Sequence, residues 1–337
     1  IPQADAEIIA TSAQFVDDQN ITAWVLGESE EGILGTATAH HPLEAGIRTF
    51  FGDSASNDTR PVWVPFHFLP GAEGNSFHEK MICQKNSVVA NKMLDHYIKP
   101  ETIQAHKEHA LHLMGIAAHV YADTFSHYGF SGFKTSLNQV DLESIYYNDS
   151  HSSEIISYIE KKKNEFLGSF TQAAELGHGA VLTNPDRPYL KWSFTYEDGR
   201  RSERNNQATF LEACQALYER FSQFANVYYE EPPQPLISWE AMKSTIATIL
   251  AKEASADDRA KAWMSAMKKS KKGPLSDIPT CRIYDNNMWL IETENFRDTS
   301  NTADFIKSNP YRFFVAADYH RSYVLKRLLP EVGLMVA

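Results

Sequence analysis

The stretch 101–128 reads ETIQAHKEHALHLMGIAAHVYADTFSHY and decides how the chain folds, because it combines a helical pattern with a high density of histidine. Pro100 stands just ahead of it, where the first turn of a helix tolerates proline, and Gly129 supplies a stop at its end. Residues 110–122 are apolar on nearly every side. We therefore predict one long helix over 101–128, buried for much of its length.

Three side chains of this segment share one face of the predicted helix. Residues four apart on an α-helix are rotated by only about 40°, so His119, Asp123 and His127 line one stripe and can point into one cavity. Zinc prefers imidazole and carboxylate ligands, and a buried carboxylate is costly unless a cation neutralises it. The alternative is a set of core histidines satisfied by hydrogen bonds, but the apolar surroundings favour a metal site. His109 and His112 lie off the stripe, and we assign them a structural or supporting role.

The rest of the chain is also dominated by helical spacing. Helical patterns cover residues 4–18, 152–177, 206–229, 239–252, 257–268 and 313–329. Residues 28–62 are rich in Gly, Ser, Thr and Asn and read as loops, while Pro and Gly keep the aromatic stretch 63–71 from forming a long helix. We expect a mainly α fold: a multi-helix bundle with a buried metal cluster, long loops and little β structure.

A proline-rich stretch divides the sequence in two. Residues 230–235 read EEPPQP and have the composition of a linker. We expect a metal-binding catalytic helical domain over residues 1–230 and a helical C-terminal extension over 236–337 that packs on it. The basic run KKSKK at 268–272 has the composition of a solvated loop.

Composition excludes several classes of protein. The chain has 337 residues, of which 43% are hydrophobic and 22% charged, enough for a large folded core. A formal net charge of −11 argues against a nucleic-acid coat or a purely electrostatic membrane binder. Cys83, Cys214 and Cys281 are far apart and read as buried apolar residues. The printed sequence has no apolar run long enough for a membrane span and does not open on a signal peptide.

Further candidate ligands lie outside the central stretch. Asp17 and Asp18 end the first predicted helix, where a carboxylate pair is more often ordinary surface charge. His67 stands within an aromatic stretch and needs a polar partner if it is buried. His178 has glycine on both sides, so a metal ion or substrate can approach it closely. Each of these residues alone fits a structural role as well as a ligand role.

The segment 119–127, HVYADTFSH, resembles the metal-binding helix of the bacterial zinc-dependent phospholipases C, whose fold is shared with the single-strand-specific nucleases of fungi and plants. The likeness is closest to a divergent bacterial branch that includes enzymes of Legionella and Pseudomonas. It extends over the stretches 8–18, 63–71, 111–132, 176–190 and 313–325. The resemblance implies a helical bundle that holds two or three zinc ions and hydrolyses phosphodiester bonds.

The resemblance also implies roles for individual residues. Asp123 would bridge two zinc ions, and a further zinc ion would be bound beside His178. Position 182, where an acid would be expected, is Leu, so the acid at that ion is Glu175 or Asp186. Members of the branch carry a His-containing segment ahead of the first helix. This sequence starts after the place where that segment would lie, so we expect one ligand of the bridged zinc ions to be missing from it. The implied ligands are Asp17, His67, His119, Asp123, His127, His178 and one of the two acids.

The implied activity is that of a phospholipase C, which releases diacylglycerol and a phosphorylated head group from a glycerophospholipid. Asp17 or Asp18 would receive the proton of the attacking water. The protein would contact a membrane surface peripherally and would be secreted or delivered as a bacterial effector. Two alternatives stay open. One is a nuclease-like phosphodiesterase on the same scaffold, against which the acidic composition counts; the other is a metal-stabilised helical protein that binds a partner without turnover.

Overall fold

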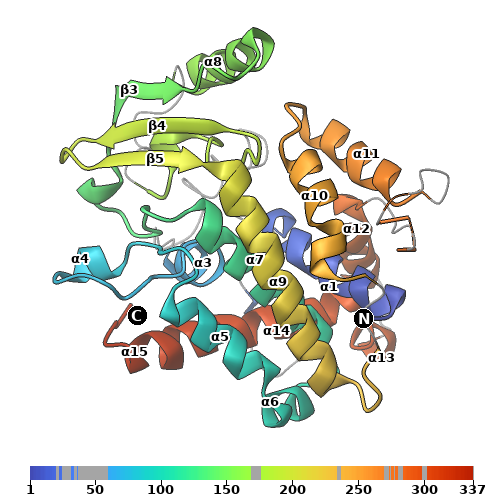
Figure 1. Ribbon diagram of the computed structural model, residues 1–337. Helices are drawn as coiled ribbons and strands as arrows, with labels where there is room; N and C mark the ends of the chain where they lie inside the picture. Colours follow the sequence, from blue (N-terminus) through green and yellow to red (C-terminus); the bar gives the residue numbers. More distant parts are fainter. Residues whose placement is uncertain are drawn as a thin grey trace.

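The structure of the protein is a computed structural model, and its fold is mainly α, as expected (Figure 1). It describes residues 1–19, 23–24, 32–33, 36, 60–167, 176–233, 237–268, 273, 275–276, 278–279, 284–297 and 302–336. No helix within these ranges is long and apolar enough to cross a membrane.

Helices make up most of the described chain. The longer ones are α1 (Gln3–Asp18), α5 (Val88–Ile98), α7 (Ala110–Ser126), α8 (Ser153–Leu167), α9 (Asn206–Tyr228), α10 (Trp239–Leu250), α11 (Ala256–Ala266), α12 (Asn286–Arg297) and α14 (Asn309–Tyr323). The short ones are α3 (Arg60–Phe66), α4 (Phe77–Lys80), α6 (Pro100–Ala105), α13 (Thr302–Phe305) and α15 (Leu329–Glu331).

Helix α7 lies at the centre of the bundle, where α1, α5, α9 and α14 pack around it (Figure 1). Its central residues, among them Ile116, Ala117 and Val120, are fully buried, which explains why the segment is apolar on nearly every side. Gly115 allows α1 to approach closely, because an ideal Cβ at Gly115 would lie 2.4 Å from the backbone oxygen of Ile9. The apolar residues of α7 therefore account for its burial, and Gly115 accounts for the close approach of α1.

A small antiparallel sheet was not expected from the sequence. It is built from β3 (Val140–Tyr147), β4 (Lys191–Tyr196) and β5 (Arg201–Asn205), with β4 in the middle and Trp192 opposite Arg204. Alternate residues of β4 are buried, as on a sheet with one face in the core. That face packs on Phe68 and Phe130 in a second apolar cluster. A two-residue pairing of β1 (Ala23–Trp24) with β2 (Gly32–Ile33) is the other described sheet.

The single helix predicted over 101–128 is wrong, because residues 106–109 form a turn between α6 and α7. The turn contains neither Gly nor Pro, so local sequence gave no sign of it. It is stabilised from outside the segment: the ring of His106 lies 3.9 Å, centroid to centroid, from that of Tyr319 in α14. Tertiary contact here overrides helical propensity.

The C-terminal part of the chain shares the main core. Phe313 and Phe314 of α14 are buried in the same apolar cluster as Met114 and Ile116 of α7. Helix α14 begins at Asn309, earlier than the predicted 313, with Ser308 accepting a hydrogen bond from the backbone N–H of Tyr311 as its N-cap. A π-helical turn, Val324–Leu328, continues it. Residues before and after the proline-rich stretch therefore build one core.

Candidate metal centre

The described residues include two acid–histidine clusters that could hold a metal ion. The first joins the end of α1, the turn after α3 and the middle of α7. Oδ1 of Asp17 lies 3.8 Å from Nδ1 of His67 and 3.7 Å from Nε2 of His119. The two ring nitrogens are 3.4 Å apart. All three ligand atoms lie within 4.8 Å of one another, so this group could hold a metal ion.

The second cluster lies just beyond the end of α7. His127 follows the last residue of the helix, and its Nε2 lies 3.1 Å from Oδ1 of Asp186. The other oxygen of that carboxylate, Oδ2, is 3.6 Å from Nε2 of His178. His178 and Asp186 flank a short 3-10 helix, Gly179–Val181. These three side chains form a second group that could hold a metal ion.

Asp123 lies between the two clusters. Its Oδ2 is 3.2 Å from Nε2 of His119, 3.4 Å from Nδ1 of His67 and 3.5 Å from Nδ1 of His127. This oxygen is buried, yet none of the three nitrogens has the geometry of a hydrogen bond to it. A buried carboxylate oxygen surrounded by ring nitrogens, without a proton directed at it, fits a position in which it faces a cation.

Backbone carbonyls orient three of the rings. Nε2 of His67 lies 2.8 Å from the oxygen of Thr36, Nδ1 of His127 lies 2.8 Å from the oxygen of His67, and Nδ1 of His178 lies 2.5 Å from the oxygen of Leu182. A carbonyl only accepts, so in each pair the ring N–H donates to it. The other ring nitrogen of each histidine then directs its lone pair into the cluster, the arrangement usual for metal-bound histidine.

The carboxylates also govern the charge of the rings. Burial lowers the pKa of His119, but the carboxylates of Asp123 and Asp17 outweigh burial and bring it to about 9. Burial likewise lowers the pKa of His127, and Asp123 and Asp186 raise it to about 9. For Asp123 burial raises the pKa, while His119 and His127 hold it well below the ordinary range. A divalent cation on these nitrogens would take the place of the ring protons, so metal binding would release protons.

Aromatic side chains form the inner wall of the second cluster. The ring of Phe68 stacks on that of His127, with centroids 4.6 Å apart and an interplanar angle of 19°. Gly177 has a φ of +56°, and a Cβ there would lie 2.6 Å from Cζ of Phe68 and 2.7 Å from the ring of Trp63. Only glycine fits both this backbone conformation and this space, which explains its place next to His178.

Arg204 of β5 supports the turn that carries His127. Its guanidinium donates hydrogen bonds to the backbone oxygens of Ser126 and Tyr128, on either side of that histidine. It also lies over the ring of Tyr128, 3.7 Å from the centroid. Sequence analysis did not identify Arg204, because its partners are carbonyl groups distant in the sequence and such partners leave no residue pattern.

The structure brings together most of the residues singled out in the sequence. Asp18 lies in neither cluster; it is buried, and its Oδ2 accepts a hydrogen bond of 2.7 Å from the hydroxyl of Tyr284. Glu175 lies outside the described residues, whereas Asp186, the other acid proposed beside His178, is in place. The residues found in or between the clusters are Asp17, His67, His119, Asp123, His127, His178 and Asp186.

The other histidines of the central stretch lie apart from both clusters. Nε2 of His112 is 3.2 Å from Oδ1 of Asn309, and Nε2 of His109 is 3.2 Å from Nδ1 of His106. His320 is fully buried between the hydroxyl of Tyr97 and the backbone oxygen of Pro65. These contacts place them in the packing of the bundle.

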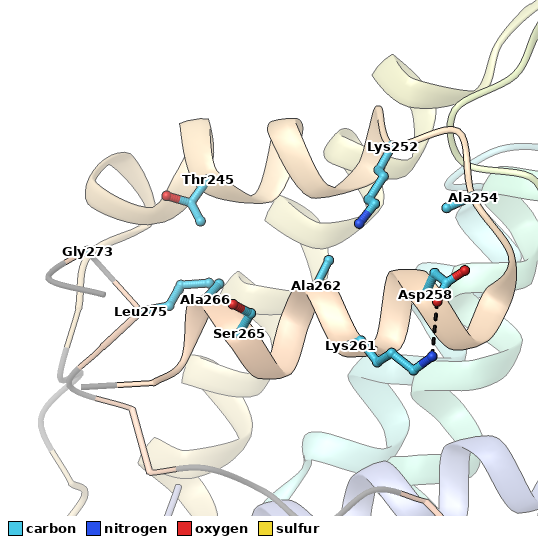
Figure 2. A pocket seen from close by; sticks show the side chains of 10 residues that line it. All are labelled: Thr245, Lys252, Ala254, Asp258, Lys261, Ala262, Ser265, Ala266, Gly273 and Leu275. Atoms are coloured by element: carbon cyan, nitrogen blue, oxygen red, sulfur yellow. Dashed lines mark hydrogen bonds and ion pairs between the residues drawn. The ribbon is translucent and has the colours of Figure 1, made fainter. Parts of the chain in front are cut away.

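A cavity of about 620 Å³ between α10 and α11 contains no cluster residue. Figure 2 shows Lys252 on one side of it and the ion pair of Asp258 with Lys261, 3.0 Å long, on the other. This ion pair is exposed, and the described residues that line the cavity include no histidine, so they do not provide the ligands found beside α7.

One protein-family model matches nearly the whole chain. It covers residues 1–328 and is that of a family of unknown function (DUF6765). No curated protein and no solved structure matches the chain. Its activity must therefore be argued from the two clusters themselves.

Proposed function

We propose an activity for this chain, which belongs to the family of unknown function DUF6765: it is a zinc-dependent hydrolase of phosphodiester bonds, most simply a phospholipase C. The observation that carries the proposal is Asp123, a buried carboxylate whose Oδ2 lies 3.2 and 3.4 Å from the ligand nitrogens of His119 and His67 and also adjoins the ring of His127, 3.5 Å from its Nδ1. A carboxylate in that position suits adjacent divalent ions that act on one phosphate group.

Each cluster would hold one ion. Asp17, His67 and His119 would bind the first, and Asp123 would contact it and reach toward the second. The ligands of the second ion would be His127, His178 and Asp186. The mixed nitrogen and oxygen donors fit zinc, and a third ion would require ligands beyond these two groups.

Zinc at such a site would lower the pKa of a bound water toward neutrality and would stabilise the negative charge on the phosphate oxygens. The chain itself would position and deprotonate the reactants. Asp17 is the best-placed proton acceptor, because its side chain is 33% exposed and belongs to the first cluster. Asp18 is less suited to this role, because its Oδ2 already accepts a hydrogen bond from the hydroxyl of Tyr284. Asp186, 38% exposed, would mark the side from which substrate approaches the second cluster.

A phospholipid is the first choice of substrate. The likeness of residues 119–127 to the zinc-dependent phospholipases C supports it. The net charge of −11 disfavours a nucleic acid, whose phosphates would be repelled except at the ions themselves. A membrane surface presents the same phosphodiester chemistry, and the protein would contact it from outside.

The test uses the full chain. Its metal content would be measured by mass spectrometry, and hydrolysis would be followed on phosphatidylcholine vesicles and on single-stranded DNA, with and without a chelator. We expect bound zinc, release of phosphocholine, and loss of that release with chelator or in Asp123→Asn. The matched control is Asp257→Asn, an exposed carboxylate in α11, which should behave like the unaltered chain.

Two outcomes would overturn the proposal. Absence of stoichiometric metal from protein purified without chelator is one. Hydrolysis that persists undiminished in Asp123→Asn is the other. Cleavage of DNA but not of lipid would agree with the proposed metal mechanism, but it would show that the substrate is a nucleic acid and not a phospholipid.

A further inference from the structure

A second and larger cavity lies away from both clusters. It has a volume of about 1250 Å³ and is lined by the helices α1, α9 and α12 with part of α10. In the view of Figure 1, α1, α10 and α12 gather at the right, beside the N-terminus. Pockets for small molecules usually measure about 300–1,000 Å³, so this cavity is large enough for an extended ligand.

Helices α1, α9 and α12 each turn one face toward this cavity. On α12 the lining residues are Asp285, just ahead of the helix, and Met288, Trp289 and Glu292, which recur at the spacing of one helical face. Helix α9 contributes a similar stripe that includes Tyr218, Phe221 and Ala225. Ile8 of α1 and Met242 of α10 add further apolar surface. The walls are thus chiefly apolar and aromatic.

The charged side chains that line the cavity all have the same sign. Glu7, Asp285 and Glu292 line it, and among its described lining residues there is no Lys, Arg or His. Two of these acids have local partners: Glu7 accepts a hydrogen bond from the amide of Gln3, and Asp285 accepts one from the backbone N–H of Asn287. The cavity therefore has an excess of negative charge.

Glu292 differs from the other two acids. It is partly buried, and within the described part of the chain it forms no hydrogen bond or ion pair. Burial raises the pKa of its carboxyl group, as expected for an acid that lacks a compensating partner. Trp289, one turn earlier on the same face of α12, is almost fully buried and lines the same space.

We propose that this cavity binds an amphiphile with a hydrocarbon chain and a positively charged head group, such as an alkylammonium, with the head group at Glu292. A cation there would pair with the carboxylate, and aromatic faces attract ammonium groups within about 6 Å. The chain would lie against Ile8, Phe221, Met242 and Met288. This site goes beyond the proposed hydrolytic activity, because no residue of either cluster lines it.

The cavity between α10 and α11 differs from the larger one, because lysine side chains line it. Lys252 and Lys261 line that smaller space, with Asp258 paired to the second of them (Figure 2). A cationic head group would be repelled by these lysines. The charged side chains of the two cavities therefore favour ligands of different charge.

The test is calorimetric titration of the full chain with decyltrimethylammonium, below its critical micelle concentration. Decyl sulfate and decyl maltoside, which have the same chain and a negative or neutral head, are titrated in parallel. We expect the cation to bind at least tenfold more tightly than either. Glu292→Gln should weaken the binding of the cationic surfactant at least tenfold and leave the binding of the neutral surfactant unchanged. Glu240→Gln, an exposed acid in α10 that does not line the cavity, is the matched control.

Met242→Trp supplies a second variant, which places a larger side chain in the cavity, leaves the Glu292 carboxylate in the sequence and should weaken the binding of all three surfactants. The metal content of each variant should equal that of the unaltered chain, so a failure here is distinguishable from a failure of the hydrolytic proposal. Equal binding of the three surfactants, no binding of the cation, or full binding by Glu292→Gln would overturn the assignment.

Discussion

The backbone oxygen of Ile9 in α1 lies so close to Gly115 in α7 that a Cβ at Gly115 would be 2.4 Å from it. Asp17 follows Ile9 by about two helical turns, and His119 follows Gly115 by about one. The close approach of the two helices therefore brings the carboxylate of Asp17 to 3.7 Å from the ring of His119. A glycine that carries no functional group sets the geometry of the first cluster.

Gly115→Ala should destabilise the protein by about 1–3 kcal/mol, the usual cost of overpacking a core. The obstacle is backbone of α1, which cannot swing aside as a side chain can. Chemical denaturation would measure the loss, and zinc titration should show weaker binding, because Asp17 would be displaced. Gly273→Ala is the control, since a Cβ there meets nothing within 4 Å. Equal stability of the two variants would refute the role of Gly115.

Asp17 and Asp18 form a matched pair of adjacent acids with different surroundings. Asp17→Asn should weaken zinc at the first cluster at least about tenfold, because it removes a charged ligand. Asp18→Asn should leave zinc affinity nearly unchanged, because Asp18 lies in neither cluster and contacts Tyr284. Competition with a chelator of known affinity would compare them. If the two variants lose zinc equally, the side chains do not have the separate roles assigned here.

The sequence predicted the central bundle well because its signals are local. Burial of α7 on all sides follows from its apolar residues, and α9 begins at Asn206 and α10 at Trp239 as predicted. In the sheet β3–β4–β5, the pairing of β3 with β4 was missed because these strands are far apart in the chain and are joined across α8. The β4–β5 hairpin is local, and its turn signal Asp198-Gly199 was overlooked. The turn at 106–109 was missed for the related reason that Tyr319, its stabilising contact, lies in α14.

The sequence identified most residues of the site but did not show how they are arranged. Spacing alone placed His119, Asp123 and His127 on one stripe, but α7 ends at Ser126, so His127 reaches the second cluster while His119 remains in the first. Helical spacing could not show this division. Nor could it choose between the acids proposed beside His178, because the position of Asp186 depends on the fold of the loop after the 3-10 helix.

The second cluster should be separable from the first. His178→Gln should remove the ion held by His127, His178 and Asp186, while the first cluster keeps its own. Metal analysis of purified protein should then give about one zinc fewer per chain than the unaltered protein. His78→Gln, which alters an exposed histidine, should retain the full content. Loss of all metal from His178→Gln would mean that the clusters do not bind independently.

His320 should make the stability of the protein depend on pH in the mildly acidic range. Burial, helped by the nearby charge of Arg321, lowers its pKa to about 4, although the backbone oxygen of Pro65 favours the protonated ring. In the unfolded chain a histidine titrates near 6.5. Between these values the unfolded state binds more protons, so the stabilisation is complete above about pH 6.5 and declines as the pH falls toward 4. One such group accounts for at most about 1.4 kcal/mol per pH unit. Urea denaturation in chelator at pH 7, 6 and 5 should therefore show a smaller decline for His320→Gln than for the unaltered chain, whereas His78→Gln should keep the full decline. An identical pH dependence in all three would show that His320 is not the group that titrates.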